Sequence, residues 1–147
     1  MSHLISISEA ASLALHTMVL LAGDCERRMA VKEISSKLRV SQNHLAKVLQ
    51  RLAKAGLVRS SRGPKGGFVL KRPSQEIDLL EVYEAIEGPI EKTHCLLGRP
   101  ICNGNRCILG GLLKGVDEEA KKYLTSTKLS DLKDVFKGDD HDASQDN

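Results

Sequence analysis

Apolar positions in the first 40 residues recur three or four apart, which is the spacing of one face of an α-helix. A first helix is predicted over residues 8–22, with Ser8 as its N-cap. A second, shorter apolar stripe predicts a helix over residues 30–38. The pair Arg39 and Val40 then interrupts the stripe, so we expect a turn at that point.

The next apolar stripe belongs to a helix with clear start and stop signals. Ser41 is the expected N-cap, the helix covers residues 42–55, and Gly56 suits the position just beyond its last turn. Its apolar face is formed by leucine and valine side chains at helical spacing, namely Leu45, Val48, Leu49 and Leu52. Polar and basic side chains therefore share the opposite face.

A basic hairpin is predicted after this helix. Leu57 and Val58, and then Phe68 to Leu70, suit two short strands, and the glycine-rich residues 62–67 suit the turn between them. The predicted order of elements is that of a winged helix-turn-helix: a helix, a short helix, a turn, a capped helix and a basic hairpin. In that motif the second helix of the pair enters the major groove of DNA.

The rest of the chain is predicted to be helical on both sides of a loop. A helix over residues 79–87 stops at Gly88-Pro89, and a long helix covers about residues 108–124. The apolar stripe of the long helix is broader than a terminal helix needs, so a dimer partner or its own domain should cover it. Its three glycines, Gly110, Gly111 and Gly115, indicate close backbone contact. A short helix is expected at residues 129–136.

The fold class predicted from these elements is mainly α with a small β-hairpin wing, divided into three parts. Residues 1–73 would form the winged helix-turn-helix DNA-binding domain. Residues 74–137 would form a linker helix, a cysteine loop and a long C-terminal dimerisation helix. Residues 138–147 are polar and acidic, and we expect a disordered tail there.

The charge of the chain is unevenly distributed. Residues 1–72 carry 13 Lys and Arg against four Asp and Glu, whereas residues 73–147 carry nine against 15. A basic first half suggests a polyanionic partner, although a solvated basic surface gives the same balance. Together with the predicted wing, the charge favours double-stranded DNA.

The candidate DNA contacts lie on the polar face of the capped helix and in the hairpin. In the first turn of that helix, Gln and Asn side chains can pair with adenine, and Lys with guanine or phosphate. Basic side chains further along would contact phosphate, and an Arg of the hairpin could enter a narrow minor groove. The predicted contacts are Ser41, Gln42, Asn43, His44, Lys47, Arg51, Arg59, Arg62 and Lys65.

Three cysteines follow in the stretch CLLGRPICNGNRC. They are Cys95, Cys102 and Cys107, at the spacing Cys-x6-Cys-x4-Cys. Three soft sulfur ligands in a short loop can hold an iron–sulfur cluster or zinc, and a Cys102–Cys107 disulfide would make a thiol switch. Arg99 and Arg106 flank the thiols and favour the thiolate that each of these chemistries needs.

Other functional classes find little support in the sequence. It has no Cys-x-x-Cys pair, no nucleotide-binding glycine loop and no convincing acid–base pair, so we do not expect an enzyme. A zinc-stabilised protein-interaction module would leave the basic hairpin unexplained. No apolar run approaches the ~20 residues that span a bilayer, and no signal peptide is recognisable. We therefore expect a cytoplasmic protein with no membrane partner and no small-molecule substrate.

Three stretches of the sequence together resemble a known family. They are similar to the Rrf2 family of bacterial winged-helix transcription regulators, the IscR- and NsrR-like proteins. The stretches are SQNHLAKVLQRLAKAGLVRSSRGPKGGFVLKRP, then DLLEVYEAIEG, and then the three cysteines. The resemblance covers about residues 4–136. It implies a homodimer on a palindromic operator, with the helix after Cys107 as the dimerisation element, and a role as a transcription regulator, typically a repressor.

The same resemblance implies a 2Fe–2S or 4Fe–4S cluster bound by the three cysteines. In one group of members the fourth ligand is a histidine three residues after the last cysteine, but that position is Gly110 here. In others it comes from the N-terminal helix of the partner subunit. A carboxylate position of this kind aligns with Ser12, and a histidine position aligns with His16. The x6 and x4 spacing departs from the commoner x5 and x5, so the cluster type stays open.

The position of His16 on the first predicted helix is compatible with the ligand role that the resemblance implies. Glu9, Ser12 and His16 lie within roughly 60° of one another at 3.6 residues per turn. A histidine at such a position is otherwise a solvated or hydrogen-bonded residue. Glu9 and His94 are the alternative ligands.

Overall fold

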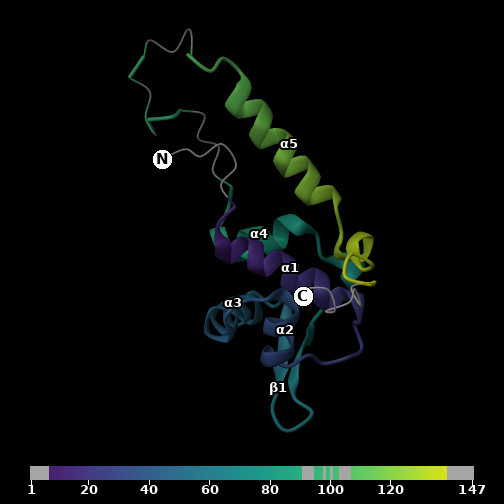
Figure 1. Ribbon diagram of the computed structural model, residues 1–147. Helices are drawn as coiled ribbons and strands as arrows, with labels where there is room; N and C mark the ends of the chain where they lie inside the picture. The colour runs from purple at the N-terminus through teal and green to yellow at the C-terminus, as the bar shows by residue number, and fades with distance from the viewer. Residues whose placement is uncertain (1–6, 91–94, 98, 100, 103–106, 139–147) are drawn as a thin grey trace, which may run out of the picture.

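The computed structural model describes residues 7–138 apart from 91–94, 98, 100 and 103–106. It is mainly helical, with one two-stranded antiparallel sheet among the described residues (Figure 1). Its elements in chain order are α1 (Glu9–Gly23), α2 (Val31–Leu38), α3 (Gln42–Lys54), β1 (Val58–Ser61), β2 (Gly67–Leu70), the short 3-10 helix η1 (Ser74–Glu76), α4 (Leu79–Glu87), α5 (Leu112–Ser126) and the 3-10 helix η2 (Leu129–Leu132).

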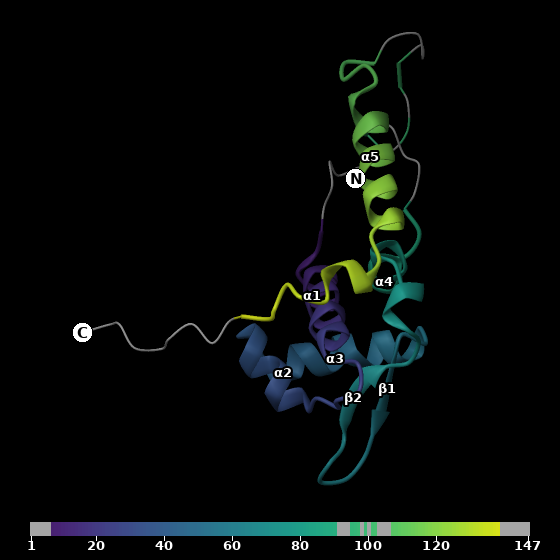
Figure 2. The ribbon, with the colours of Figure 1, turned by 90° about the vertical axis from the view of Figure 1, so that its right-hand side faces the viewer.

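The described chain has two regions, a packed module and an arm. Residues 7–88 and 127–138 form a packed module, and α5 forms an arm that projects from it. The hairpin of β1 and β2 lies at the end of the module opposite the arm in both views (Figures 1 and 2). The arm contacts the module mainly through α4.

Helix α1 is the centre of the module. Ser8 caps it as predicted, because its hydroxyl accepts the backbone N–H of Ala11 at 3.1 Å. The helix packs against α2, α3, α4, β2 and η2. Burial therefore extends beyond the predicted stripe to positions such as Leu13 and Val19, which lie on other faces.

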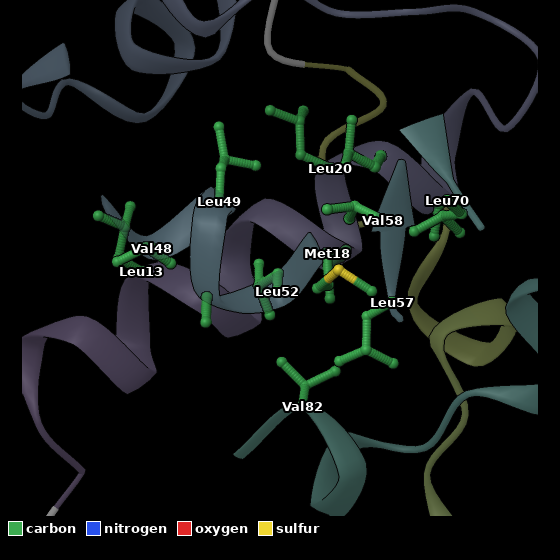
Figure 3. Close-up of a cluster of buried hydrophobic side chains, with 14 of the residues drawn as sticks. Leu13, Met18, Leu20, Val48, Leu49, Leu52, Leu57, Val58, Leu70 and Val82 are labelled. Carbon is green, nitrogen blue, oxygen red and sulfur yellow. The ribbon is translucent and has the colours of Figure 1, made fainter. Parts of the chain in front are cut away.

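The core of the module is aliphatic and draws on every helix around α1. Figure 3 shows Met18 of α1 beside Leu52 of α3, Leu57 at the start of the hairpin and Val82 of α4. Met18, Leu52, Leu57 and Val82 are all fully buried. Burying side chains of this size contributes about 1.5–3 kcal/mol each, which offsets part of the conformational entropy lost when the module folds.

The predicted turn between the second and third helices is confirmed. Arg39 is the one non-glycine residue of the described chain with a positive φ, at 55°, which is the left-handed region. This conformation lets the backbone N–H groups of Arg39 and Val40 bond the last carbonyls of α2, at Ser36 and Ser35. The chain is then directed into α3, whose cap at Ser41 also forms as predicted.

The hairpin is joined to the connection between α1 and α2. Its strands pair antiparallel from Val58 with Leu70 to Ser61 with Gly67. Met29 adds a bridge to Phe68, with N–H to carbonyl distances of 3.0 and 2.8 Å in the two directions. This third segment anchors β2, near its turn end, to the connection between the helices and was not predicted.

The chain returns to the module after the arm. Leu129 donates its N–H to the carbonyl of Ile77 at 2.9 Å, and Leu79 donates to Thr127 at 3.1 Å. Leu129 and Ile77 are both fully buried in the same core as α1 and α3. The predicted domain boundary at residue 73 therefore does not coincide with an edge of the core.

The prediction of the long helix was wrong at its start. The helix begins at Leu112 rather than at residue 108, because Gly110 adopts φ +56° in a turn and donates its N–H to the Cys107 carbonyl at 3.0 Å. Only Gly115 lies within the helix, and a Cβ added there would meet no atom of another element within 4 Å. The glycines therefore do not mark close backbone contact within the described chain.

The predicted helix over residues 129–136 is only partly present. Residues 129–132 form the 3-10 helix η2, and the bonds that follow also join residues three apart, as from Val135 to Leu132. The tail predicted for residues 138–147 lies outside the described residues except for Gly138. None of the described helices is long and apolar enough to cross a membrane.

Candidate nucleic-acid interface and cysteine loop

Helix α3 presents a polar face at its N-terminal end. Ser41 Oγ accepts the backbone N–H of His44 at 3.4 Å, which fixes the first turn. Gln42, Asn43 and Lys47 are exposed, while the four predicted apolar positions of the helix are buried. The side chains with amide and ammonium donors are therefore available to a partner, as a recognition helix requires.

Two of the predicted contacts on α3 already have partners in the protein. His44 Nδ1 lies 3.6 Å from Glu9 Oε1 at the start of α1, and the His44 side chain is only partly exposed. Arg51 Nη2 donates to the backbone carbonyl of Ile86 at the end of α4. Sequence reasoning placed both side chains on the polar face but did not find these partners, which lie 35 residues or more away.

The hairpin presents basic side chains on a turn shaped by glycine. Arg59, Arg62 and Lys65 are exposed, as predicted. Gly67 has φ +151°, and a Cβ added there would lie 2.6 Å from the carbonyl carbon and oxygen of Met29. Only glycine allows the strand to approach Met29 this closely, so the glycine-rich turn positions the basic tip.

Arg28 is a candidate contact that sequence reasoning missed. It precedes Met29, the residue that pairs with the hairpin, and it lines an open cavity together with Lys65 of the wing and the carboxylates of Glu26 and Glu33. Neighbouring Arg27 is paired with Glu33 at 2.6 Å, whereas Arg28 has no ion pair among the described residues. No local pattern indicated this residue, because only the bridge to Phe68 brings it beside the wing.

The three cysteines of the loop differ in exposure. Cys102 and Cys107 are exposed and Cys95 is half-buried, and no disulfide joins any pair of the described cysteines. The fourth cysteine, Cys25, lies outside the loop, and its thiol donates to the Ala22 carbonyl at 3.1 Å. Arg106 and His94, which were also considered from the sequence, lie outside the described residues.

His16 lies on an exposed face of α1. Its Nδ1 is 2.7 Å from the backbone carbonyl of Ser12, and its ring centroid is 6.4 Å from that of Phe136 in the C-terminal segment. A carbonyl only accepts hydrogen bonds, so Nδ1 carries a proton in this contact, and in the neutral ring Nε2 then holds the lone pair. That is the tautomer in which a histidine can bind a metal through Nε2.

The donor chemistry of these residues suits an iron–sulfur cluster. Three accessible thiols are the soft ligands that iron–sulfur clusters use, and His16 Nε2 could supply a fourth donor. The described residues do not gather three potential ligands at one point, so His16 and the cysteines are not assembled within this part of a single chain.

The arm leaves apolar side chains exposed on both of its ends. Leu112 is 53% exposed and Tyr123 is 57% exposed, and Ile108, just before the arm, is 90% exposed. Where the arm meets α4, burial raises the pKa of Tyr83, and the carboxylates of Glu87 and Asp117 raise it further. The arm is thus only partly covered by its own module.

Comparison with protein families gives one match over most of the chain. The model of the Rrf2 family, described as an iron-dependent transcriptional regulator, matches residues 7–134. The HTH-type transcriptional regulator IscR of Photorhabdus laumondii is 33% identical over 108 residues, which is 73% of this chain. The match spans 65% of the length of that relative, which is less than two thirds.

Solved structures with the same arrangement are found as well. The structure of CymR, described as the global cysteine regulator of B. subtilis, is similar with a TM-score of 0.76 at 27% identity, covering 89% of this chain and 98% of that one. IscR of T. potens has a TM-score of 0.70 at 22% identity, covering 89% of this chain and 88% of that one, which supports the fold alone. The winged-helix fold class predicted from the sequence is thereby confirmed.

Proposed function

Because the chain belongs to the Rrf2 family of transcriptional regulators, we propose that it binds a palindromic operator as a homodimer, and that its cysteine loop carries the signal that controls binding. One observation carries the proposal. The exposed polar turn of α3 and the basic wing belong to the module, and the wing projects at the end opposite the arm. Two copies joined through their arms would thus leave both wings free for DNA.

In this proposal each DNA contact has a separate task. Gln42, Asn43 and Lys47 meet base edges from the first turns of α3, because recognition helices read the major groove with that end. The wing residues Arg59, Arg62 and Lys65 bind the sugar-phosphate backbone. Arg28, which lines the same cavity as Lys65, adds a further cation beside the wing. Phosphate contacts would set most of the affinity, and the α3 contacts would set the sequence preference.

The arm is proposed as the dimerisation element. Leu112 and Tyr123 are large side chains that remain more than half exposed in the single chain. A second arm packed against them would remove this apolar surface from water, which favours association. In a symmetric dimer each arm uses the same surface, so two modules would present two recognition helices to half-sites about 34 Å apart.

The signal is proposed to enter through the three thiols of the loop. Cys95, Cys102 and Cys107 would hold an iron–sulfur cluster, of the 2Fe–2S or 4Fe–4S type, with His16 as the candidate fourth ligand. When bound, such a cluster supplies a centre that oxidants and nitric oxide can alter. The residues of this chain would supply the thiolates, the protonated Nδ1 that orients His16, and a loop that joins α4 to the arm.

A second candidate is a cluster-free regulator that responds by thiol oxidation. The exposure of Cys102 and Cys107 favours it. Oxidation of this pair would form an S–S bond and release two electrons and two protons to an oxidant such as a peroxide or a low-molecular-weight disulfide.

Operator binding at several salt concentrations tests the DNA-binding part. A protein that neutralises Z phosphates loses affinity with a slope of about −0.9 Z in log K against log salt. We expect a steep slope for the native chain, and a shallower slope by about one contact for Arg62→Ala, measured by fluorescence anisotropy. A weak operator affinity that does not change with salt concentration would contradict the proposal. Gln42→Ala is the matched control, since it should change sequence preference without changing the slope.

Anaerobic purification with an iron assay and visible absorbance separates the two signal candidates. A coloured protein that binds iron, with a spectrum altered by His16→Ala, supports the cluster with His16 as ligand. A coloured protein whose spectrum is unchanged by this substitution would exclude His16 as a ligand but keep the cluster. A colourless, iron-free protein whose operator affinity changes on oxidation supports the thiol switch. An operator affinity that changes neither with cluster content nor with thiol oxidation would contradict sensing by the loop.

A further inference from the structure

The C-terminal end of α4 is the stem from which the cysteine loop departs. The helix ends at Glu87, and Gly88 with φ +77° turns the chain away seven residues before Cys95. The last carbonyls of a helix have no partner within it and need one from elsewhere. Gly88 N–H bonds the Glu84 carbonyl, but the Ile86 carbonyl must find another donor.

That donor comes from the recognition helix. Arg51, in the last turn of α3, donates from Nη2 to the Ile86 carbonyl. The guanidinium therefore sits at the negative end of the α4 dipole, where a positive charge is favoured, and it lies in the last turn of its own helix as well. Arg51 links two helix ends that are 35 residues apart in the sequence.

Two further polar contacts join the same region. The Ser8 hydroxyl at the cap of α1 donates to the Glu87 carboxylate of α4. Glu9, the next residue, lies 3.6 Å from Nδ1 of His44 on α3. One connected set of contacts therefore joins the start of α1, the end of α4 and helix α3 where the cysteine loop departs.

We propose that Arg51 is a positioning residue that couples the orientation of the recognition helix to the conformation of the cysteine loop. This inference rests on the proposed role of the loop as the entry point of the signal. A change in the loop displaces the end of α4, and the Arg51–Ile86 bond transmits that displacement to α3. A guanidinium has five N–H donors, so Arg51 can keep this bond and contact a DNA phosphate at the same time.

Linkage requires the coupling to act in both directions. If the loop changes the affinity for DNA, then DNA must change the equilibrium of the loop by the same factor, typically about 5–150-fold. Operator binding should therefore alter the reactivity of Cys95, Cys102 and Cys107 even when no oxidant is present. Cys25 lies outside the loop and provides an internal reference.

The first experiment measures thiol labelling in the full chain. The reduced, metal-free protein is treated with iodoacetamide with and without saturating operator DNA, and the alkylation of each cysteine is followed by mass spectrometry. We expect DNA to change the labelling rate of the loop thiols relative to Cys25 by at least ~3-fold. No change in the native protein would overturn the inference.

The second arm of the experiment compares two variants of α3. Arg51→Met removes the donors but keeps an apolar stem, and Lys54→Met removes a basic side chain from the same turn. At saturating DNA, we expect the labelling effect to fall below ~2-fold in Arg51→Met and to persist in Lys54→Met. An effect in Arg51→Met equal to that of the native protein would overturn the inference, and urea unfolding checks that both variants remain folded.

Operator affinity before and after hydrogen peroxide distinguishes this inference from the proposed function. If the native protein responds and Arg51→Met responds equally, the coupling through Arg51 is wrong while sensing stands. If DNA changes thiol labelling through Arg51 but peroxide has no effect on affinity, the coupling stands while sensing of oxidants is wrong. The expected result is a native response that is reduced at least ~3-fold by Arg51→Met and kept by Lys54→Met.

Discussion

The module and the arm use apolar side chains in opposite ways. In the module, Met18, Leu49 and Leu52 are fully buried between helices of the same chain. On the arm, Leu112 and Tyr123 are more than half exposed. Both regions show an apolar stripe in the sequence, so the stripe alone does not reveal whether its partner lies in the same chain or in another one.

The two regions also differ in how firmly the backbone is held. The module joins its helices through contacts between distant segments, such as Met29 with Phe68 and Ile77 with Leu129. The arm contacts mainly α4, and the chain that leads to it carries the exposed thiols Cys102 and Cys107. In the proposed function, the firmly held module would supply the DNA-binding surface and the arm would supply assembly and control.

The largest effect is expected from a cavity in the core of the module. Leu49→Ala should lower the free energy of unfolding by about 2–5 kcal/mol, because a fully buried leucine leaves a void that its neighbours only partly fill. Urea denaturation followed by circular dichroism measures the change. Leu112→Ala on the arm, at protein concentrations below the dissociation constant of the proposed dimer, should cost less than ~1 kcal/mol. Equal losses of unfolding free energy in the two variants would contradict this difference between the module and the arm.

A charge on the arm should affect assembly rather than folding. Leu112→Glu places a carboxylate on the exposed apolar surface, so we expect monomers in sedimentation velocity experiments. Operator affinity should fall about 100-fold, because two modules that are no longer joined lose the advantage of binding together. Unfolding of the monomer should be unchanged. A dimer that survives this change would place the interface elsewhere.

The hairpin depends on the close approach of glycine to Met29. Gly67→Ala puts a Cβ 2.6 Å from the carbonyl carbon and oxygen of Met29, and these backbone atoms cannot move away without moving the paired segment. We expect the free energy of unfolding to fall by about 1–3 kcal/mol. Gly63→Ala is the matched control, since Gly63 has a positive φ in the same hairpin but open space where its Cβ would lie. Thermal unfolding of both variants separates the steric cost from the conformational one, and equal losses would argue against the steric explanation.

The cap of the recognition helix should make a smaller contribution. Ser41→Ala removes the acceptor for the His44 N–H and should cost about 1 kcal/mol of stability. Ser41→Thr keeps a hydroxyl and should recover most of it. Chemical denaturation of the two variants checks this ranking, which an unchanged stability in Ser41→Ala would contradict.

The smallest effect concerns the joint between the arm and the module. Tyr83 has a pKa above its usual value near 10 because of burial and then the carboxylates of Glu87 and Asp117. Folding therefore favours the neutral phenol, and stability is lost as the pH rises from the unfolded pKa through the folded one. Absorbance titration of Tyr123→Phe, in which Tyr83 is the only tyrosine, should give a midpoint above 10 that Glu87→Gln lowers. A midpoint at or below 10 would contradict this environment.

The helices of the module could be predicted from the sequence because their signals are local. Ser8 and Ser41 each cap the helix that follows by accepting the backbone N–H three residues further on. Gly56 follows the end of α3 with φ +76°. The same local chemistry was misread at Gly110, which lies in an apolar pattern with helical spacing but adopts φ +56° and delays the start of α5. A periodic pattern indicates a helix but does not by itself reveal where a glycine leaves it.

The candidate DNA contacts were predicted as a set, but their surroundings were not. The polar face of α3 follows from helical periodicity once the buried face is known, so the exposure of Gln42, Asn43 and Lys47 needed no tertiary information. Arg28 gained its place beside the wing only through the bridge of Met29 to Phe68. Residues with no local pattern become candidates only when distant segments meet.

The sequence by itself determined the winged-helix order of elements, the polar face of the recognition helix and the three thiols of the loop, because each depends on residues within a few positions of one another. Only the tertiary structure decided that Arg51 holds the end of α4, that His44 lies beside Glu9, and that Leu129 returns to the core. These contacts join segments 35 or more residues apart. Their formation depends on how the buried faces pack, which no local spacing specifies.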